Sequence, residues 1–334
     1  MMSQLPELVQ VLLKPEAYPE APQQVEMVQT QMSFVFLTDS YVYKVKKPVN
    51  LGYLDYTTLE KRQFYCQREV ELNRRLCPDV YIGVVPITRE KDNIYIDGQD
   101  KVLEYAVKMR RLPEGAMMNV LLASNQVSLE MVTSVAQKLV EFHQKAETNA
   151  YISAFGDLDT ITQNTEENFT QTEKYIGNTL SPEQYQHIKD YTNSFVEKNA
   201  HLFCKRIADG RIRDCHGDLH AAHICFTNDI CIYDCIEFND RFRYCDVASE
   251  VAFLAMDLDH YGWADLSHSF VNAYVDESKD NELLQLLSFY KCYRAYVRGK
   301  VEGFKLDDPH ISQEEKTRTL AIARSYFELA ESNI

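Results

Sequence analysis

The chain has 334 residues, of which 45% are hydrophobic and 25% charged, proportions typical of a folded protein with a sizeable core. Its 35 basic and 50 acidic side chains give a net charge of −15, which argues against nonspecific nucleic-acid binding because that requires a basic surface. No apolar run of about 18 residues occurs, so we expect no membrane span.

The cysteines and the N-terminal residues indicate a compartment. Nine cysteines, an odd number with no CxxC pair, suit a reducing environment. The first residues lack the basic and then apolar pattern of a secretion signal. We therefore expect a cytoplasmic protein. Five cysteines lie between Cys215 and Cys245, and we interpret them as small apolar core residues rather than zinc ligands.

The N-terminal part of the chain has the pattern of a small antiparallel sheet. Residues 1–24 predict a helix followed by a proline-bearing loop. β-Prone runs bounded by turn residues predict strands at 25–29, 33–38, 41–45, 80–87, 94–97 and 102–108. Lys44 is a polar residue inside the third of these strands, where on its own it indicates a solvent-facing position. Lys46 and Lys47 are competing candidates for a functional lysine.

One helix interrupts these strands. A Thr-x-x-Glu capping box at residues 57–60 predicts a helix that runs to about residue 77. Glu69 lies beside the apolar stripe of this helix, where an acid needs a partner. Lys44 is the obvious partner, although Arg68 or Lys61 would equally give Glu69 an ordinary surface pair.

Residues 109–115 break the strand pattern, and helices dominate beyond them. Apolar residues at helical spacing predict helices at 129–145, 164–180, 182–203 and 249–259. Ser181 and Pro182 form the start signal of the third helix. His143 lies on the apolar face of the first helix, so we expect a satisfied core histidine and not a ligand.

The most informative stretch, residues 215–224, reads Cys-His-Gly-Asp-Leu-His-Ala-Ala-His-Ile and places ionisable side chains between apolar runs. The β-prone runs that follow are separated by three turn residues and predict a hairpin. If Phe226 pairs with Ile230, then His223 lies beside Tyr233, and Asp234 ends at the same mouth of the hairpin. Two carboxylates and an imidazole that converge there would bind a divalent cation and orient a hydroxyl group.

This His-Gly-Asp-x-x-x-x-His pattern, followed by a hairpin and Asp234, resembles the catalytic loop and metal aspartate of the aminoglycoside phosphotransferase family. The fold of that family is similar to that of protein kinases. Asp234 precedes Asp246 of an Asp-Val-Ala sequence by the family's usual spacing. Other matching segments are 43–49, 167–169, 236–240 and 293–300, so the resemblance covers nearly the whole chain.

The resemblance implies a two-lobed, protein-kinase-like α+β fold. We expect an antiparallel-sheet N-lobe at 1–108, a hinge at 109–115 and a mostly helical C-lobe at 116–334. The closest branch of the family is bacterial and commonly carries a P-loop ATP-binding domain after this part. The chain ends at Ile334 without one, so the resemblance implies the kinase-like part alone, with a separate P-loop ATP-binding protein as a partner.

The resemblance further implies a phosphotransferase that moves a phosphoryl group from ATP or GTP to a hydroxyl of a small molecule. Mg²⁺, or Mn²⁺ in its place, would assist. Two alternatives stay open: a nucleotide-binding regulatory pseudokinase and a protein kinase. Asp218 would be the catalytic base, with His216 in its loop. Asp234 and His223 would bind the metal, although the family usually has asparagine at the position of His223, and imidazole suits softer metals than Mg²⁺.

The nucleotide phosphates would be bound by Lys44, braced by Glu69. No glycine precedes Gly52, so the chain lacks a Gly-rich loop, and the turn at Thr30 and Ser33 would have to replace it. The hinge residues Met109 and Arg111 would lie beside the base of the bound nucleotide.

The acceptor is the least determined part of this expectation. The candidate residues are His220, Glu237, Asp257, Arg294 and Arg298. Glu237 is also a rival of Asp234 for the metal, since Ile-Glu-Phe imitates the expected Ile-Asp-Phe. Arg294 and Arg298 lie one helical turn apart. They form either a solvated basic face or a pocket for an anionic acceptor, because guanidinium groups bind carboxylate or phosphate bidentately.

Overall fold

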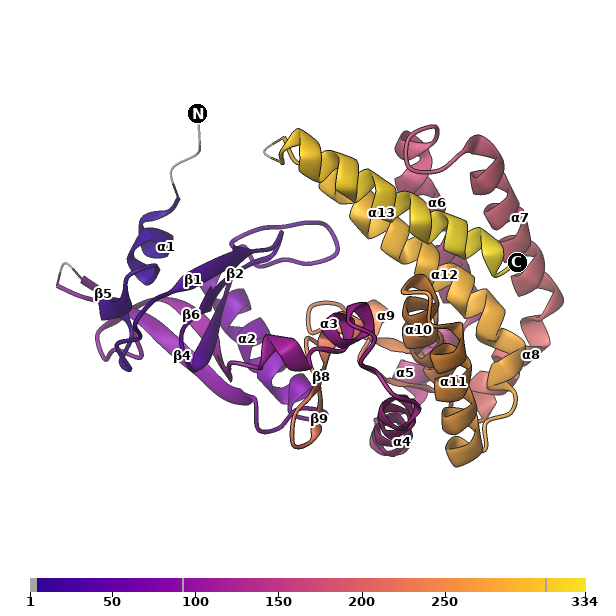
Figure 1. Ribbon diagram of the computed structural model, residues 1–334, viewed down its shortest axis with the longest axis horizontal. Helices are drawn as coiled ribbons and strands as arrows, with labels where there is room; N and C mark the ends of the chain where they lie inside the picture. The colour runs from indigo at the N-terminus through magenta and orange to yellow at the C-terminus, as the bar shows by residue number, and fades with distance from the viewer. Residues whose placement is uncertain (1–4, 92, 310) are drawn as a thin grey trace. The chain divides into compact units, whose positions relative to one another are not determined.

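The structure is a computed structural model that describes residues 5–91, 93–309 and 311–334 (Figure 1). The chain forms two compact units. The first comprises Met1–Met117 and His223–Asp240, and the second comprises Met118–Ala222 and Arg241–Ile334. Across the described residues, no helix combines the length and the apolar character that a membrane crossing needs.

The first unit is built on a six-stranded antiparallel sheet with the strand order β1-β2-β3-β6-β4-β5 (Figure 1). The predicted strands are confirmed, with ends that agree or differ by at most three residues. The strands are β1 (Glu26–Gln29), β2 (Ser33–Leu37), β3 (Tyr41–Lys46), β4 (Tyr81–Glu90), β5 (Asn93–Ile96) and β6 (Lys101–Arg110).

Alternation along β3 decides which side chains meet which helix. Tyr43 and Val45 are buried in a core that also contains Val9 and Leu12 of α1 (Glu7–Leu12). Because successive strand residues point to opposite faces, the intervening Lys44 and Lys46 point to the other face. That face packs against α2 (Leu59–Asn73), whose Cys66 and Val70 contact Val107 and Met109 of β6 in a second core.

The helix α2 is shorter than the predicted 57–77. Thr58, rather than Thr57, is its N-cap, because the Thr58 hydroxyl accepts the N–H of Lys61 at 3.3 Å. The Thr57 hydroxyl instead donates to Asp55 Oδ1 at 2.6 Å. The helix ends at Asn73, so the capping-box prediction was wrong by one residue at the start and by four at the end.

The predicted hairpin is confirmed with its register. In β8 (Ile224–Phe226) and β9 (Ile230–Ile232), Phe226 pairs with Ile230 and Cys225 with Cys231. Both cysteines belong to the core that contains α2 and β6, which explains why residues 223–240 form part of the first unit. This division differs from the expected one, in which everything after residue 115 belonged to the C-lobe. Met109 and Arg110, expected in the hinge, are the last residues of β6.

Cys77, which follows α2, and Cys231 of β9 form a disulfide. Cys231 is a buried core residue, as interpreted from the sequence, but the sequence did not predict this bond. The two residues are 154 positions apart, and nothing local in the sequence relates them. Five of the seven remaining cysteines are buried, in agreement with the core interpretation.

The second unit is mostly helical, and α10 is buried along nearly its whole length. The long helices α12 and α13 run side by side (Figure 1). The second unit also contains a two-stranded sheet, in which β7 (Ile212–Asp214) pairs with β10 (Tyr244–Asp246). The helices are α3 (Met118–Ala123), α4 (Leu129–Lys145), α5 (Ala150–Ser153), α6 (Leu158–Thr172), α7 (Pro182–Lys198), α8 (Ala200–Ala208), α9 (Asp240–Arg243, of which Asp240 falls in the first unit), α10 (Val247–His260), α11 (Ala264–Ser278), α12 (Leu283–Lys305) and α13 (Gln313–Ser332).

Among these helices, the prediction at 129–145 is confirmed to the residue, and Ser181 caps α7 as expected. The helix predicted at 164–180 is confirmed only over 164–172, since α6 begins at Leu158 and ends at Thr172. The buried side of α6 is largely polar, so apolar spacing does not mark its ends. The predicted helix at 182–203 is two helices. Asn199 leaves helical geometry between them, and its side-chain amide donates to Phe195 O at 2.9 Å.

Candidate active site

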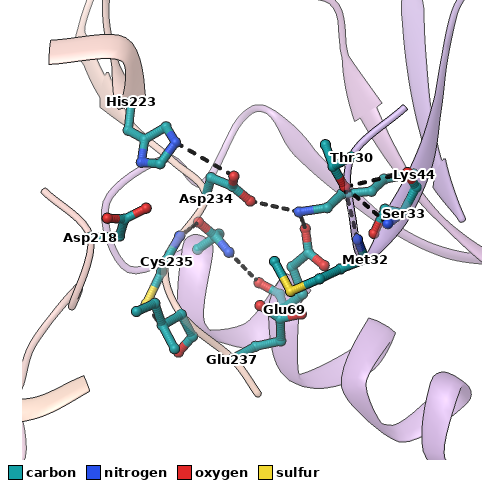
Figure 2. Close-up of polar contacts among 12 residues, drawn as sticks. Thr30, Met32, Ser33, Lys44, Glu69, Asp218, His223, Asp234, Cys235 and Glu237 are labelled. Carbon is teal, nitrogen blue, oxygen red and sulfur yellow. Dashed lines mark hydrogen bonds and ion pairs between the residues drawn. The ribbon is translucent and has the colours of Figure 1, made fainter. Parts of the chain in front are cut away.

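In the first unit, the ammonium group of Lys44 binds two carboxylates (Figure 2). Nζ lies 2.6 Å from Asp234 Oδ1 and 2.9 Å from Glu69 Oε1. Burial disfavours the charged amine, but Asp234 and then Glu69 outweigh it and hold the pKa of Lys44 well above its ordinary value. Lys44 is therefore a permanent cation at neutral pH, and the predicted pairing with Glu69 is confirmed.

Lys46 completes a buried charge cluster on the same sheet face. Its side chain is 1% exposed and binds Glu69 Oε2 at 2.6 Å and also Glu237. Glu237 Oε1 in turn accepts the Tyr56 hydroxyl at 2.6 Å. Burial disfavours ionisation of Glu69, but the two lysines outweigh it and lower its pKa. Glu237, the expected rival metal ligand and acceptor residue, is therefore committed to a buried ion pair.

The backbone of Asp234 has an unusual conformation. Its φ is +64°, a left-handed conformation that non-glycine residues rarely adopt and that tends to mark functional sites. Its N–H donates to the hydroxyl of Tyr81 at 3.2 Å, and 39% of its side chain is exposed. His223 lies beside Tyr233, whose N–H donates to His223 O at 3.0 Å, as the register predicts. His223 Nε2 lies 3.6 Å from Asp234 Oδ2 (Figure 2).

These donors can be compared with what a divalent cation requires. Mg²⁺ prefers oxygen ligands and is commonly held by one or two carboxylates together with substrate phosphates. Asp234 supplies such a carboxylate, with Oδ1 on Lys44 and Oδ2 toward His223. The imidazole of His223 is a softer donor. Within the first unit, the donor set fits one hard cation shared with phosphates, with Asp234 as its protein ligand.

The turn expected to replace a Gly-rich loop is closed by its own hydroxyl. Thr30 Oγ1 accepts the N–H groups of Ser33 at 2.9 Å and Met32 at 3.3 Å (Figure 2). Thr30 N in turn donates to Ser33 O at 2.9 Å, and Ser33 is 1% exposed. In this conformation, two of the turn's N–H groups are directed to Thr30 rather than outward to a phosphate.

The two expected hinge residues are held by the sheet. Met109 is 8% exposed in the core and pairs with Val42 of β3 and Tyr81 of β4. The N–H of Arg111 donates to Ser40 O at 2.9 Å, and its guanidinium group donates to Thr38 O at 2.8 Å. Both residues end the sheet rigidly, and their role in base binding stays a prediction.

In the second unit, Asp218 lies on a loop whose backbone N–H groups donate hydrogen bonds to a buried carboxylate. Glu250 of α10 accepts the N–H of Gly217 at 2.7 Å and the N–H of His216 at 2.8 Å. His143 Nε2 lies 2.8 Å from the other end of the same carboxylate, so the expectation that His143 is a satisfied core residue is confirmed. His216 is fully buried, and its Nδ1 accepts the N–H of Asp218 at 3.3 Å.

Two further acceptor candidates also hold this loop. Asp257, 2% exposed, accepts the N–H of Ala221 at 2.8 Å. Arg294, 6% exposed, donates to Gly217 O at 3.2 Å and to Ser249 Oγ at 3.0 Å. A solvated basic face at Arg294 is therefore wrong. Its guanidinium group binds the loop that carries Asp218 and holds that loop in place.

The remaining candidates, His220 and Arg298, lie beside Asp218. His220 Nε2 is 3.6 Å from Asp218 Oδ2 and 3.5 Å from Arg298 Nη1. Burial disfavours the charge of Arg298, but Tyr326, Asp218 and Asp257 outweigh it and raise its pKa. Arg298 Nε is buried and has no hydrogen-bond partner among the described residues. The guanidinium groups of the two arginines therefore differ, because that of Arg294 binds the loop and that of Arg298 lies beside His220.

Glu250 is the site-supporting residue that sequence reasoning missed. Asp246, the aspartate of the Asp-Val-Ala sequence, does not take this part: it caps α10 at Ala248 N and binds Arg206 Nη2 at 2.6 Å. The sequence contained a signal for this role, because Glu250 and Asp257 are seven residues apart in a helix that is mostly apolar. They therefore lie on one face, where an acid requires a partner.

Replacing Glu250 with glutamine should remove an acid-sensitive part of the protein's stability. Despite burial, which raises the pKa, His143, His216 and the Gly217 N–H lower the pKa of Glu250 to about 2. A folded pKa below the unfolded value stabilises the protein above pH about 4.5, and this contribution is lost as pH falls toward 2. We expect the variant to unfold about 2 kcal/mol more easily at pH 7.

The measurement is urea unfolding at pH 7, 5, 4 and 3, with Glu314→Gln on the exposed side of α13 as the matched control. The gap between wild type and Glu250→Gln should narrow toward pH 3. A gap that is constant over this range would show that Glu250 contributes no proton-linked stability.

Comparison with known proteins gives relatives in sequence and in structure. No family model matches the chain. Uncharacterized proteins of Mycobacterium bovis and Mycobacterium tuberculosis are 31% identical to it over 309 residues, which is 92% of this chain. The chain spans 60% of the length of these relatives.

Three solved structures are similar to the chain over nearly its full length. A choline/ethanolamine kinase family protein from Mesorhizobium loti has a TM-score of 0.54 and 10% identity, covering 98% of both chains. An amicoumacin kinase in complex with AMP-PNP and Ca²⁺ has a TM-score of 0.52 and 13% identity, covering 96% of this chain and 92% of its own. An aminoglycoside phosphotransferase from Alicyclobacillus acidocaldarius has a TM-score of 0.50 and 12% identity, covering 99% and 95%.

Proposed function

The chain has the protein-kinase-like fold of the aminoglycoside phosphotransferases and choline/ethanolamine kinases, and from that premise we propose that it is a small-molecule kinase. It would transfer the γ-phosphoryl group of a nucleotide to a hydroxyl group. The observation that carries the proposal is the Lys44 ammonium between Glu69 and a conformationally strained Asp234. A lysine held in place by one carboxylate beside a second, partly exposed one is suited to binding a phosphate–metal complex.

Each residue has a stated part in this reaction. Lys44 binds the nucleotide phosphates, and Glu69 keeps its ammonium group in position. Asp234 holds Mg²⁺ or Mn²⁺, which would neutralise charge on the transferred group. Asp218 takes the proton of the acceptor hydroxyl. Because little covalent chemistry falls to the protein, most of the acceleration comes from positioning and charge neutralisation.

The contacts of Arg294 and Arg298 restrict the chemical class of the acceptor molecule that we propose. Arg294 is engaged with the loop, so a two-arginine anion pocket is not supported, and a single guanidinium group, Arg298, is left beside His220. Two carboxylates lie next to these side chains: Asp218 Oδ2 is 3.6 Å from His220 Nε2, and Glu302 Oε1 is 4.0 Å from Arg298 Nη2. We propose a polyhydroxylated acceptor that carries one hydrogen-bond-accepting or anionic substituent, such as a sugar acid.

A regulatory nucleotide-binding protein without turnover is the second candidate. The observation that favours it is the turn at Thr30, whose hydroxyl already accepts two of the N–H groups that a phosphate cradle would use. His223, in the place of the family's asparagine, points the same way, because it suits a softer metal than Mg²⁺.

The test is a phosphotransfer screen with ATP and with GTP, each with Mg²⁺ and with Mn²⁺. Sugar acids, phosphorylated metabolites, aminoglycosides and neutral polyols serve as acceptors, and mass spectrometry detects an added phosphate. The screen is run on this chain alone and with a P-loop ATP-binding protein, the partner that the resemblance implies. We expect a phosphorylated small molecule. Nucleotide binding without any product would favour the regulatory protein, and label on polypeptide would indicate a protein kinase.

A further inference from the structure

The disulfide between Cys77 and Cys231 joins two segments of the first unit that lie far apart in the sequence. Cys77 follows the C-terminal end of α2, and Cys231 is the central residue of β9. Their Cα atoms are 4.8 Å apart, and the two residues are 3% and 5% exposed. The bond therefore joins a helix to a hairpin inside the core.

Each of the two joined segments carries one carboxylate partner of the Lys44 ammonium. Glu69 lies on α2, and Asp234 lies three residues after Cys231 (Figure 2). Two weaker contacts join the same segments: Asn73 Oδ1 accepts the N–H of Cys235 at 2.9 Å, and Arg75 Nη2 lies 3.4 Å from Cys235 Sγ. The disulfide is thus the covalent member of the link that sets Glu69 and Asp234 on either side of Lys44.

We infer that Cys77 and Cys231 form a reversible thiol modification site whose oxidant is a low-molecular-weight disulfide, and that the oxidised state strengthens ligand binding at Lys44 and Asp234. The inference deepens the proposed function, because it takes the bound ligand to be the nucleotide. With both thiols free, the hairpin is held on α2 by noncovalent contacts, among them core packing and the contacts of Asn73 and Arg75 with Cys235, and the ligand must then supply more of the ordering of the cluster.

The chemistry is two successive thiol–disulfide exchanges. The thiolate of one cysteine attacks a sulfur of the small disulfide, forms a mixed disulfide and releases one small thiolate. The second cysteine thiolate attacks the protein sulfur of that intermediate, closes the bond between residues 77 and 231 and releases the other small thiolate. The protein thiols lose two electrons and two protons, and the small disulfide becomes two thiols.

The neighbouring thiol of Cys225 does not readily attack this disulfide. Cys225 lies opposite Cys231 in the register of the hairpin and is fully buried. Because its thiol is enclosed in the core, Cys225 is a poor nucleophile toward the disulfide. Exchange therefore depends on small thiols, which reach the buried sulfurs only when the hairpin opens.

Thermodynamic linkage makes the inference measurable from both sides. If oxidation raises the affinity for a ligand by some factor, that ligand favours the oxidised state by the same factor. We expect reduction by dithiothreitol to weaken binding of ATP with Mg²⁺ at least about fivefold, the lower end of typical coupling. Saturating ATP should slow reduction of the disulfide, because it opposes opening of the hairpin that holds Asp234.

The experiment uses the full chain, oxidised with glutathione disulfide or reduced with dithiothreitol, and measures ATP affinity by calorimetry. Peptide mapping under non-reducing conditions identifies the bond between residues 77 and 231. The double variant Cys77→Ser with Cys231→Ser should have the affinity of the reduced protein under both conditions. Cys204→Ser, which removes an exposed cysteine of α8, should keep the full redox response.

The outcomes separate this inference from the proposed function. Equal ATP affinity in the oxidised and reduced wild-type protein overturns it, as does the absence of the mapped bond after treatment with glutathione disulfide. If the protein binds no nucleotide, the proposed function fails, and hydrogen exchange at residues 224–234 decides the inference instead. Faster exchange on reduction supports the link, and unchanged exchange overturns it. This comparison within the wild-type protein also holds if the double variant does not fold.

Discussion

Replacing Asp218 with asparagine should lower kcat by about 10²- to 10⁴-fold, the range that a general base contributes. Asparagine has the same shape but cannot accept the acceptor's proton. The loop should keep its conformation, because its contacts with Glu250 and Arg294 use the backbone of His216 and Gly217 rather than the Asp218 side chain. Nucleotide affinity should be unchanged, since Lys44 and Asp234 are untouched.

The measurement combines steady-state kinetics, on the acceptor that the screen identifies, with calorimetric titration of the nucleotide. Asp190→Asn, which changes an exposed carboxylate of α7, is the matched control and should behave as wild type. Turnover that survives in Asp218→Asn would exclude Asp218 as the base. Loss of nucleotide binding in the same variant would show that the aspartate supports the fold and not the proton transfer.

Replacing Lys44 with methionine should lower kcat/KM for the nucleotide by about 10²- to 10³-fold, the effect of removing one preorganised charge from a phosphoryl site. Methionine keeps the length and apolar stem of lysine but leaves the phosphates without their cation. Because Lys46 still binds Glu69 at 2.6 Å, that buried carboxylate retains a partner, and the fold should persist. The loss should be visible in both nucleotide affinity and turnover.

Two other lysines of the same segment provide the controls for Lys44→Met. Lys47→Met should be nearly silent in kinetics, because its ammonium group donates to the carbonyl oxygen of Thr30, outside the cluster of Lys44, Glu69 and Asp234. Lys46→Met should act mainly on stability, since Lys46 is 1% exposed and its loss strands Glu237 in the core. Thermal unfolding separates the two effects. If Lys44→Met binds nucleotide with wild-type affinity, Lys44 is not the phosphate-binding lysine.

The sequence alone determined the parts of this protein that depend on local pattern. The hairpin register follows from two β-prone runs and a three-residue turn, so the neighbourhood of His223 and Tyr233 was predictable before any coordinates. The same holds for the helix at 129–145, whose apolar face is fully regular. The fold class followed from the resemblance of the His-Gly-Asp pattern and of the other matching segments to the aminoglycoside phosphotransferase family.

Tertiary structure alone decided which charges meet. Alternation along β3 places Lys44 and Lys46 on one face, but it does not say that both reach Glu69 or that Glu237 closes the cluster. Helical periodicity likewise places Glu250 and Asp257 on one face of α10 without naming their partners. The bond between Cys77 and Cys231 spans 154 residues, and no local signal relates its ends.

The physical reason is the same in each of these cases. Backbone propensity and side-chain periodicity act over a few residues, and they fix which face of an element is buried. A buried charge is stabilised only by a partner brought to it through packing of distant segments, and that partner is chosen by the whole core. The sequence therefore determined the elements and the chemistry they carry, and the folded core determined the pairs that position it.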